Sequence, residues 1–128
     1  MRLLLDTYTF LWFIADHSRL STQARSLIED AANDIVLSIA SVWEMAIKIS
    51  LGKLSLDTTF ATFIPEQLRL NQIDLLGINI EHLSALVSLP FYHRDPFDRL
   101  LIAQAIVENI PLIGVDEAFD AYPSVRLC

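Results

Sequence analysis

Short runs of consecutive apolar residues recur along this 128-residue chain, and sequence with helical periodicity separates them. We expect strands at residues 2–6, 35–38, 75–78 and 112–115, and an edge strand at 125–127. Unbroken apolar runs are typical of parallel strands that helices cover on both faces. The alternation therefore predicts an α/β fold with a mostly parallel central sheet.

The segments between these runs carry helix signals. Ser21 is a candidate N-cap for a second helix, and Gly52 is suited to the left-handed position that ends the third. The other helices are expected at residues 7–15, 41–51, 59–71, 80–88 and 95–108, with a helical turn at 116–122. No repeat, low-complexity stretch or linker divides the chain, so we expect a single domain over residues 1–128.

Composition and net charge limit the location and the binding partners that we expect for this protein. The chain is 53% hydrophobic, yet Asp6, Glu44 and Pro111 are among the residues that break every apolar run short of the ~20 residues needed to span a membrane. One cysteine allows no internal disulfide, so we expect a cytoplasmic protein whose surplus apolar surface serves an oligomer or partner. The net charge of −7 disfavours nucleic-acid binding unless metal ions and a local basic patch offset it.

Two acidic residues end predicted strands. Asp6 follows the first strand and Asp116 follows the fourth. In parallel α/β sheets, ligands bind outside the carboxyl ends of the strands. Each residue is equally well interpreted as the N-cap of the helix that follows it.

Glu44 has two interpretations. Ser41 and Glu44 have the spacing of a capping box, which explains the acid by helix initiation alone. If Ser38 is the cap instead, Glu44 lies deeper in the helix and needs another reason to be there.

Asp95 and Asp98 open the strongly apolar helix at residues 95–108. Asp95 fits the N-cap and Pro96 the first helical position, and an acid at Asp98 favours the helix dipole. We interpret Asp95 as the cap, whereas for Asp98 a ligand role competes with the dipole.

Together these acids predict a metal site. Clustered carboxylates repel one another unless they are protonated or bind a cation, and oxygen ligands suit Mg²⁺ or Mn²⁺. Such an ion polarises phosphoryl oxygens and generates hydroxide from water. The histidines are interpreted as surface or capping residues: His17, His82 and His93. No Ser-His-Asp order, Walker loop or dinucleotide fingerprint is present.

The motifs resemble those of the PIN-domain family, most closely the VapC-type toxins of bacterial toxin–antitoxin pairs. The matching segments cover nearly the whole chain in the same order: residues 3–7, 41–48, 51–54, 93–105 and 112–122. The resemblance implies a three-layer α/β/α sandwich and a Mg²⁺- or Mn²⁺-dependent ribonuclease that arrests translation. It also implies a homodimer and a cognate antitoxin whose tail covers the site.

The family's acidic quartet falls on Asp6, Glu44, Asp98 and Asp116, with Asp95 as a plausible auxiliary acid and Thr7 beside the metal. We expect Asp6, Asp98 and Asp116 to hold one or two ions, and Glu44 to bind the second ion or to orient the attacking water. The candidates to guide the RNA backbone, each otherwise an ordinary solvated charge, are Lys48, Lys53, Arg94 and Arg99.

Two other functions compete with the ribonuclease. The first is a catalytically weak PIN-like module that acts through protein contacts, which Gly114 favours because the family often carries Thr or Ser there. The second is a metal-dependent phosphatase on a similar sheet, although no dedicated phosphate loop supports it.

Overall fold

A computed structural model describes residues 1–114, 116–122 and 126–128. Its sheet has the strand order β3-β2-β1-β4-β5, and every described pairing is parallel, which confirms the predicted α/β class. The strands are β1 (Arg2–Leu5), β2 (Asp34–Ser38), β3 (Ile73–Leu76), β4 (Leu112–Ile113) and β5 (Arg126–Leu127). Val115 and Val125, which we expected in strands, lie outside the described residues.

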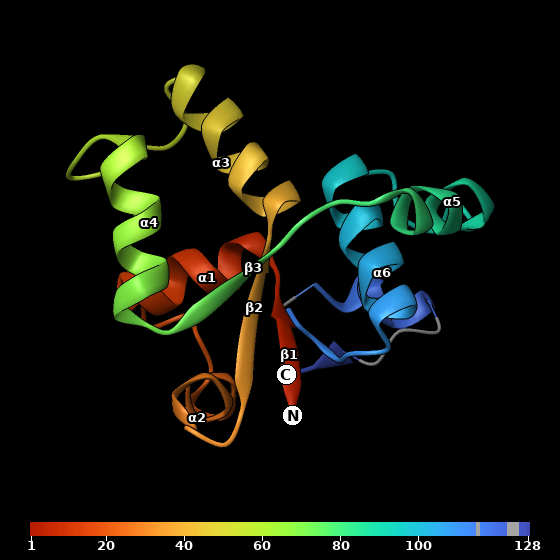
Figure 1. Ribbon diagram of the computed structural model, residues 1–128, viewed down its shortest axis with the longest axis horizontal. Helices are drawn as coiled ribbons and strands as arrows, with labels where there is room; N and C mark the ends of the chain where they lie inside the picture. Colours follow the sequence, from red (N-terminus) through yellow and green to blue (C-terminus); the bar gives the residue numbers. More distant parts are fainter. Residues whose placement is uncertain (115, 123–125) are drawn as a thin grey trace.

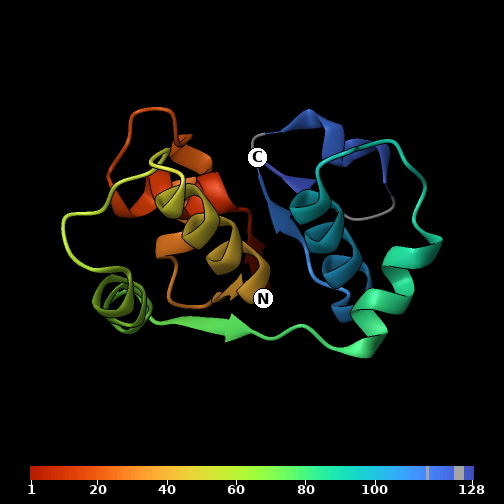
Figure 2. The same cartoon turned by 90° about the horizontal axis from the view of Figure 1, so that it is seen from above.

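Helices cover both faces of the sheet, so the molecule has the expected three layers. Figure 1 shows α1, α2 and α4 on one side of the strands and α5 and α6 on the other, and Figure 2 shows the same separation from above. The helices are α1 (Thr7–Ile14), α2 (Thr22–Glu29), α3 (Ile39–Ser50), α4 (Phe60–Leu70), α5 (Ile80–Ser88), α6 (Pro96–Glu108) and the 3₁₀ helix η1 (Glu117–Ala121).

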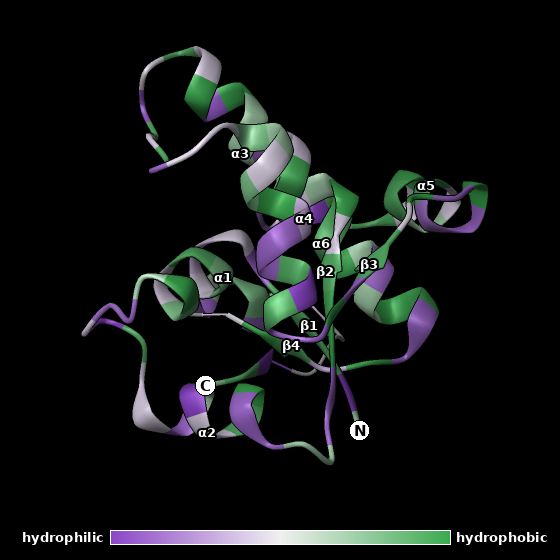
Figure 3. Ribbon diagram, turned by 60° about the vertical axis from the view of Figure 1, so that its left-hand side comes forward, coloured by the Kyte–Doolittle hydropathy of each residue, from purple (hydrophilic) through white to green (hydrophobic). Residues whose placement is uncertain are grey.

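Alternate side chains of the central strands enter two separate cores. Leu3 and Leu5 of β1 pack toward α1 and α2, whereas Leu4 between them packs toward α6. β2 repeats this pattern with Leu37 on the first side and Val36 on the second. Figure 3 shows hydrophobic residues along these strands. Burial on both faces explains why the strands are wholly apolar rather than alternating.

The start of α3 and both ends of β3 differ from the predicted boundaries by two residues. α3 begins at Ile39 because Ser38, directly after β2, is its N-cap and accepts a hydrogen bond from the Ala40 N–H. β3 begins at Ile73, which pairs with Ile35, and it ends before Gly77. The strand prediction started too late because β3 is an edge strand whose exposed Asp74 interrupts the apolar pattern.

β1 lies at the centre of the sheet, between β2 and β4. The chain adds β2 and β3 on one side of β1 and then crosses to add β4 on the other. Such a change of direction leaves a crevice at the carboxyl ends of the two strands that flank it. Within the described ranges, no helix has the length and apolar character needed to cross a membrane.

Candidate metal centre

Asp6 leaves the carboxyl end of β1 and caps α1. Its Oδ1 accepts a hydrogen bond of 2.7 Å from the Thr9 N–H, and its own N–H donates to the Ile113 carbonyl of β4 at 3.0 Å. The residue is 5% exposed. Capping and location at the crevice, which the sequence presented as alternatives, therefore coexist at Asp6.

Glu44 lies in the second turn of α3, 5% exposed. The capping-box interpretation is wrong, because Ser38 rather than Ser41 caps the helix. Glu44 Oε1 accepts a hydrogen bond of 2.7 Å from the Thr7 hydroxyl, and Oε2 lies 3.0 Å from Lys48 Nζ. Both carboxylate oxygens thus have partners, one from the residue that follows Asp6.

Lys48 lies between the buried Glu44 and the exposed Tyr8 and contacts both. Its ammonium donates to the Tyr8 hydroxyl at 2.8 Å and lies 4.5 Å from the centre of that ring. Partial burial lowers the pKa of Lys48, but hydrogen bonds to Tyr8 and Glu44 outweigh it and raise the pKa overall. Lys48 therefore stays protonated and balances the Glu44 charge.

Asp95 and Asp98 lie at the start of α6, and Asp95 is the N-cap that the sequence predicted. Asp95 Oδ1 accepts hydrogen bonds from the N–H groups of Phe97 and Asp98, at 2.9 and 3.1 Å. Asp95 is therefore the N-cap, and Pro96 occupies the first turn without losing a hydrogen bond. The cap leaves the Asp98 carboxylate projecting from the first helical turn.

Asp98 lies among other acids. Desolvation is the largest cause that raises its pKa to about 7, followed by the negative charge of Asp95. His93 opposes this rise, whereas Glu44 and Asp6 add to it. The acids from β1, α3 and α6 are thus close enough for their charges to act on one another.

His93 lies between Asp116 and Asp98. His93 Nε2 lies 3.1 Å from Oδ2 of Asp98 and 3.1 Å from Oδ2 of Asp116. Among the described residues, one ligand atom from each of these three side chains falls within 4.8 Å of the others, a spacing suited to a metal ion. The Ala118 N–H and His93 lower the pKa of Asp116, against partial burial.

The structure therefore gathers all four predicted acids at the carboxyl ends of the strands, and His93 lies between Asp98 and Asp116. Sequence reasoning missed His93, which it interpreted as a surface or capping residue. The available signal was its position in the sequence, since His93 lies two residues before Asp95 and five before Asp98. His82 is a capping residue as expected, but it is fully buried rather than on the surface.

A family model described as the PIN domain matches residues 3–125. The chain belongs to the PIN-domain family.

A curated relative supports this assignment. "Ribonuclease VapC16" of Mycobacterium tuberculosis (strain ATCC 25618 / H37Rv) is 36% identical over 70 residues, which is 52% of this chain and 50% of the relative. The aligned region thus spans about half the length of the curated relative.

Solved structures share the fold of this PIN domain at low identity. The VapBC2 crystal structure from Rickettsia felis, bound to a promoter DNA fragment, has a TM-score of 0.74 and 15% identity, and covers 99% of this chain and 98% of that one. VapBC-1 from nontypeable Haemophilus influenzae has a TM-score of 0.68 and 16% identity, over 99% and 97% of the two chains. FitAcB from Neisseria gonorrhoeae has the same score and identity, over 98% and 96%.

The presence of glycine at position 114 has a steric explanation in this PIN domain. A Cβ at this position would lie 2.9 Å from Asp6 Oδ2 and 3.0 Å from Cε2 of the buried Phe119. The hydroxyl residue that is frequent in the family would therefore collide with the carboxylate it is expected to steady.

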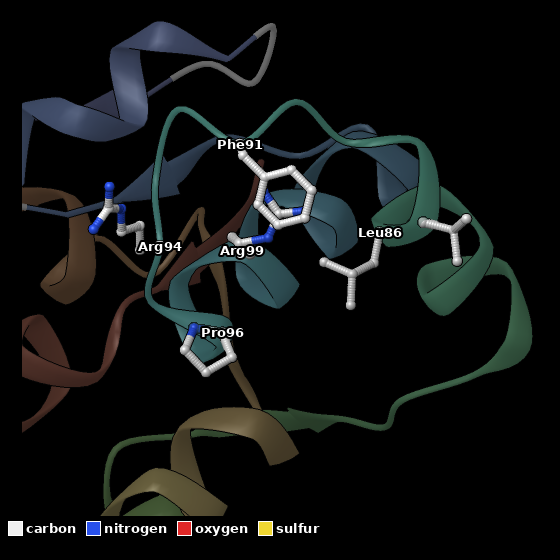
Figure 4. A pocket seen from close by; sticks show the side chains of 6 residues that line it. Leu86, Phe91, Arg94, Pro96 and Arg99 are labelled. Carbon is white, nitrogen blue, oxygen red and sulfur yellow. The ribbon is translucent and has the colours of Figure 1, made fainter.

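Arg99 fits neither sequence interpretation, because it is 6% exposed and bound to the backbone. Its guanidinium donates to the carbonyls of Pro90 and Leu89 at 2.8 and 3.2 Å and lies 3.9 Å from the centre of the Phe91 ring. Arg94, by contrast, is exposed, and Figure 4 shows it apart from this stack. A pocket of about 340 Å³ beside them is lined by Leu86, Val87, Phe91, Arg94, Pro96 and Arg99.

The donor set of the PIN domain suits a hard divalent cation. Asp6, Asp98 and Asp116 offer carboxylate oxygens, which Mg²⁺ and Mn²⁺ prefer. Burial is the main cause of the raised pKa of Asp98, and the negative charges of Asp95, Glu44 and Asp6 raise it further. A cation would remove that repulsion, so the residues present fit a metal ion.

Proposed function

We propose that this PIN domain is a divalent-metal-dependent endoribonuclease, and that it acts as the toxin of a toxin–antitoxin pair in the cytoplasm. The observation that carries the proposal is the convergence of Asp6, Glu44, Asp98 and Asp116 beyond the carboxyl ends of β1 and β4, where Asp98 has a pKa of about 7. The name of the Mycobacterium tuberculosis relative, a ribonuclease, supports it.

Asp6, Asp98 and Asp116 are the residues that would hold Mg²⁺ or Mn²⁺. When bound, the ion would stabilise negative charge on the scissile phosphate and lower the pKa of a water molecule. Glu44 accepts hydrogen bonds from Thr7 and Lys48 through both oxygens, so we assign it to orienting the attacking water rather than to binding an ion. A carboxylate held on both sides keeps its orientation while a proton moves nearby.

The RNA backbone would approach across exposed cations. Arg94 lies between His93 and Asp95, has no ion pair among residues 1–114, 116–122 and 126–128, and is exposed. Lys53 is also exposed, at the far end of α3, whereas Lys48 is engaged by Glu44. We do not assign Arg99 to RNA binding, because its guanidinium donates to the carbonyls of Pro90 and Leu89.

A cognate antitoxin and a second copy of the chain are the proposed protein partners. Structures that share the fold include proteins titled as VapBC assemblies, which supports an antitoxin partner. A small upstream open reading frame that encodes a DNA-binding fold with a long tail would identify it, and co-purification of the two products would test the pairing.

The competing hypothesis, a catalytically weak binding module, rested on Gly114. Because Phe119 and Asp6 fill the space beside Gly114, the glycine follows from packing and does not by itself indicate a weakened site.

The direct test is cleavage of structured RNA by the purified protein with Mg²⁺ or Mn²⁺. We expect Asp6→Asn and Asp98→Asn each to reduce the rate at least 100-fold, because each removes a proposed metal ligand. Asp74→Asn is the matched control, since Asp74 is exposed on β3.

Equal cleavage by wild type and both site variants would contradict the proposal, because the activity would then come from elsewhere. Cleavage of small phosphoesters without cleavage of RNA would favour the phosphatase. A protein that neither cleaves RNA nor binds either metal would favour the binding module.

A further inference from the structure

His93 forms a hydrogen bond with Asp116 and lies within ion-pair distance of Asp98. Its Nε2 atom is 3.1 Å from Asp98 Oδ2 and 3.1 Å from Asp116 Oδ2, which come from different segments of the chain. The proposed function assigns these acids to the metal and leaves the histidine without a role. The inference below rests on that assignment of the metal site.

The imidazole of His93 is held in one orientation. Its Nδ1 accepts a hydrogen bond of 3.1 Å from the Asp95 N–H, and its ring stacks on Phe119 with the two ring centres 6.0 Å apart. The His93 N–H donates to the Tyr122 hydroxyl at 2.7 Å, which in turn donates to the Pro90 carbonyl at 2.7 Å. Contacts from α6, η1 and the preceding loop therefore fix the side chain, which is 13% exposed.

These contacts determine where the ring carries its proton. A neutral imidazole has one N–H donor and one acceptor nitrogen. Because Nδ1 accepts from Asp95, the proton of the neutral ring is on Nε2, which faces the two carboxylates. Binding a cation through Nε2 would move that proton to Nδ1, where it would meet the Asp95 N–H, a second donor. The geometry thus disfavours His93 as a ligand.

We propose that His93 is a positioning residue that donates its Nε2–H to Asp116 while the ring lies against Asp98, and so holds two metal-binding carboxylates at the correct separation. A single N–H between two acids offsets their repulsion while the metal is absent. A carboxylate accepts more than one contact, so each acid keeps lone pairs for the ion. Hydrogen bonds of this kind orient ligands and typically change metal affinity 10–100-fold.

The first experiment measures Mn²⁺ affinity by calorimetry for the full chain and three variants. We expect His93→Leu to weaken binding about 10–100-fold, because Asp116 loses its hydrogen-bond donor and the ring between the two acids is removed. His93→Gln, whose amide N–H reaches a similar place, should recover part of the loss. His17→Gln is the matched control, because His17 is an exposed histidine that contacts Arg19 and Trp12 rather than the acids.

Circular dichroism of each variant separates lost affinity from lost folding. Wild-type affinity in a folded His93→Leu variant would overturn the proposal. If His93→Leu does not fold, the comparison of His93→Gln with wild type decides, and a loss in His93→Gln greater than about 100-fold would overturn the donor role.

The second experiment observes the ring itself. Nitrogen-15 NMR of the metal-free protein should show the Nε2–H form of His93, and the same form after Mg²⁺ is added. An Nδ1–H form in either state would overturn the proposal, as would a directly bound imidazole nitrogen in the pulsed electron paramagnetic resonance spectrum with Mn²⁺. Absence of any metal binding by the wild type would instead refute the metal site of the proposed function, while the metal-free NMR spectrum still tests the ring.

Discussion

Asp98 couples protonation to folding. Burial and the neighbouring acids Asp95, Glu44 and Asp6 raise its pKa to about 7, against the influence of His93. In an unfolded chain an aspartate titrates near ~3.9. Between those two values the folded protein binds more protons than the unfolded chain, so the contribution of Asp98 to stability falls as pH rises.

We therefore expect Asp98→Asn to stabilise the metal-free protein at pH 8 by about 1–2 kcal/mol, a gain that disappears toward pH 4. Urea denaturation at several pH values measures this, with Asp74→Asn as the control. Mn²⁺ affinity of the wild type should also fall below pH 7, by up to about tenfold per pH unit, because the ion competes with the proton. A stability difference between wild type and Asp98→Asn that does not change with pH would contradict the raised pKa of Asp98.

Gly114 is predicted to resist even the smallest side chain. Gly114→Ala would bring a methyl group against Asp6 and Phe119, so we expect a loss of about 1–3 kcal/mol in the free energy of unfolding. Mn²⁺ affinity should fall as well, since Asp6 must move. Gly77→Ala is the control, because nothing lies within 4 Å of a Cβ there. Equal stability of Gly114→Ala and wild type would show that the site relaxes freely.

The loop between α5 and α6 depends on Arg99, whereas Arg94 faces solvent. Arg99→Met leaves the Leu89 and Pro90 carbonyls without their donor, so we expect a loss of about 2–3 kcal/mol and faster proteolysis of the loop. Arg94→Met should change stability by less than about 0.5 kcal/mol, yet weaken RNA binding and reduce its salt dependence. Limited proteolysis and salt-dependent RNA binding distinguish the two variants. Equal effects of Arg99→Met and Arg94→Met would contradict a structural role for Arg99 and an RNA-binding role for Arg94.

Most of the fold was predictable because its strands are buried on both faces. Short apolar runs such as those around Leu4 and Val36 are typical of strands in a parallel sheet that helices cover on both faces. β3 was misplaced because an edge strand is half exposed and its pattern is diluted by Asp74. The start of α3 was ambiguous because two serines were suitable caps, and only the end of β2 decides between them.

The acids of the proposed site could be chosen from the sequence, but the side chains that contact them could not. Strand ends and helix starts brought Asp6, Asp98 and Asp116 to one edge by a rule of topology. Which groups satisfy these acids depends on tertiary contacts, so His93 was missed and Arg99 was misassigned. Histidine and arginine have long or orientable side chains whose partners the local sequence does not specify.

The whole molecule has an apolar surface on α5 and the loop after it. Ile80, Val87 and Phe91 are 80%, 85% and 81% exposed, and Figure 3 shows hydrophobic residues along α5 at the outside of the fold. Clustered apolar exposure is typical of interaction surfaces. We expect this surface to be buried in the proposed homodimer.

Sedimentation velocity tests this expectation. Val87→Lys should convert a wild-type dimer to a monomer, because a charge would be buried without a partner. Leu70→Lys, at a 57% exposed position on α4 and on the other side of the sheet, should remain dimeric. A dimer that survives Val87→Lys, or a monomeric wild type, would contradict it.

The central place of β1 has a consequence for synthesis of the protein. β1 leaves the ribosome before the other strands, but one of its two neighbours, β4, begins only at Leu112. Asp6 and Asp116 cannot meet until that neighbour has been translated and paired. Under the proposed function, a nascent chain therefore has an incomplete metal site until β4 has been made, which delays RNA cleavage near the ribosome that is making it.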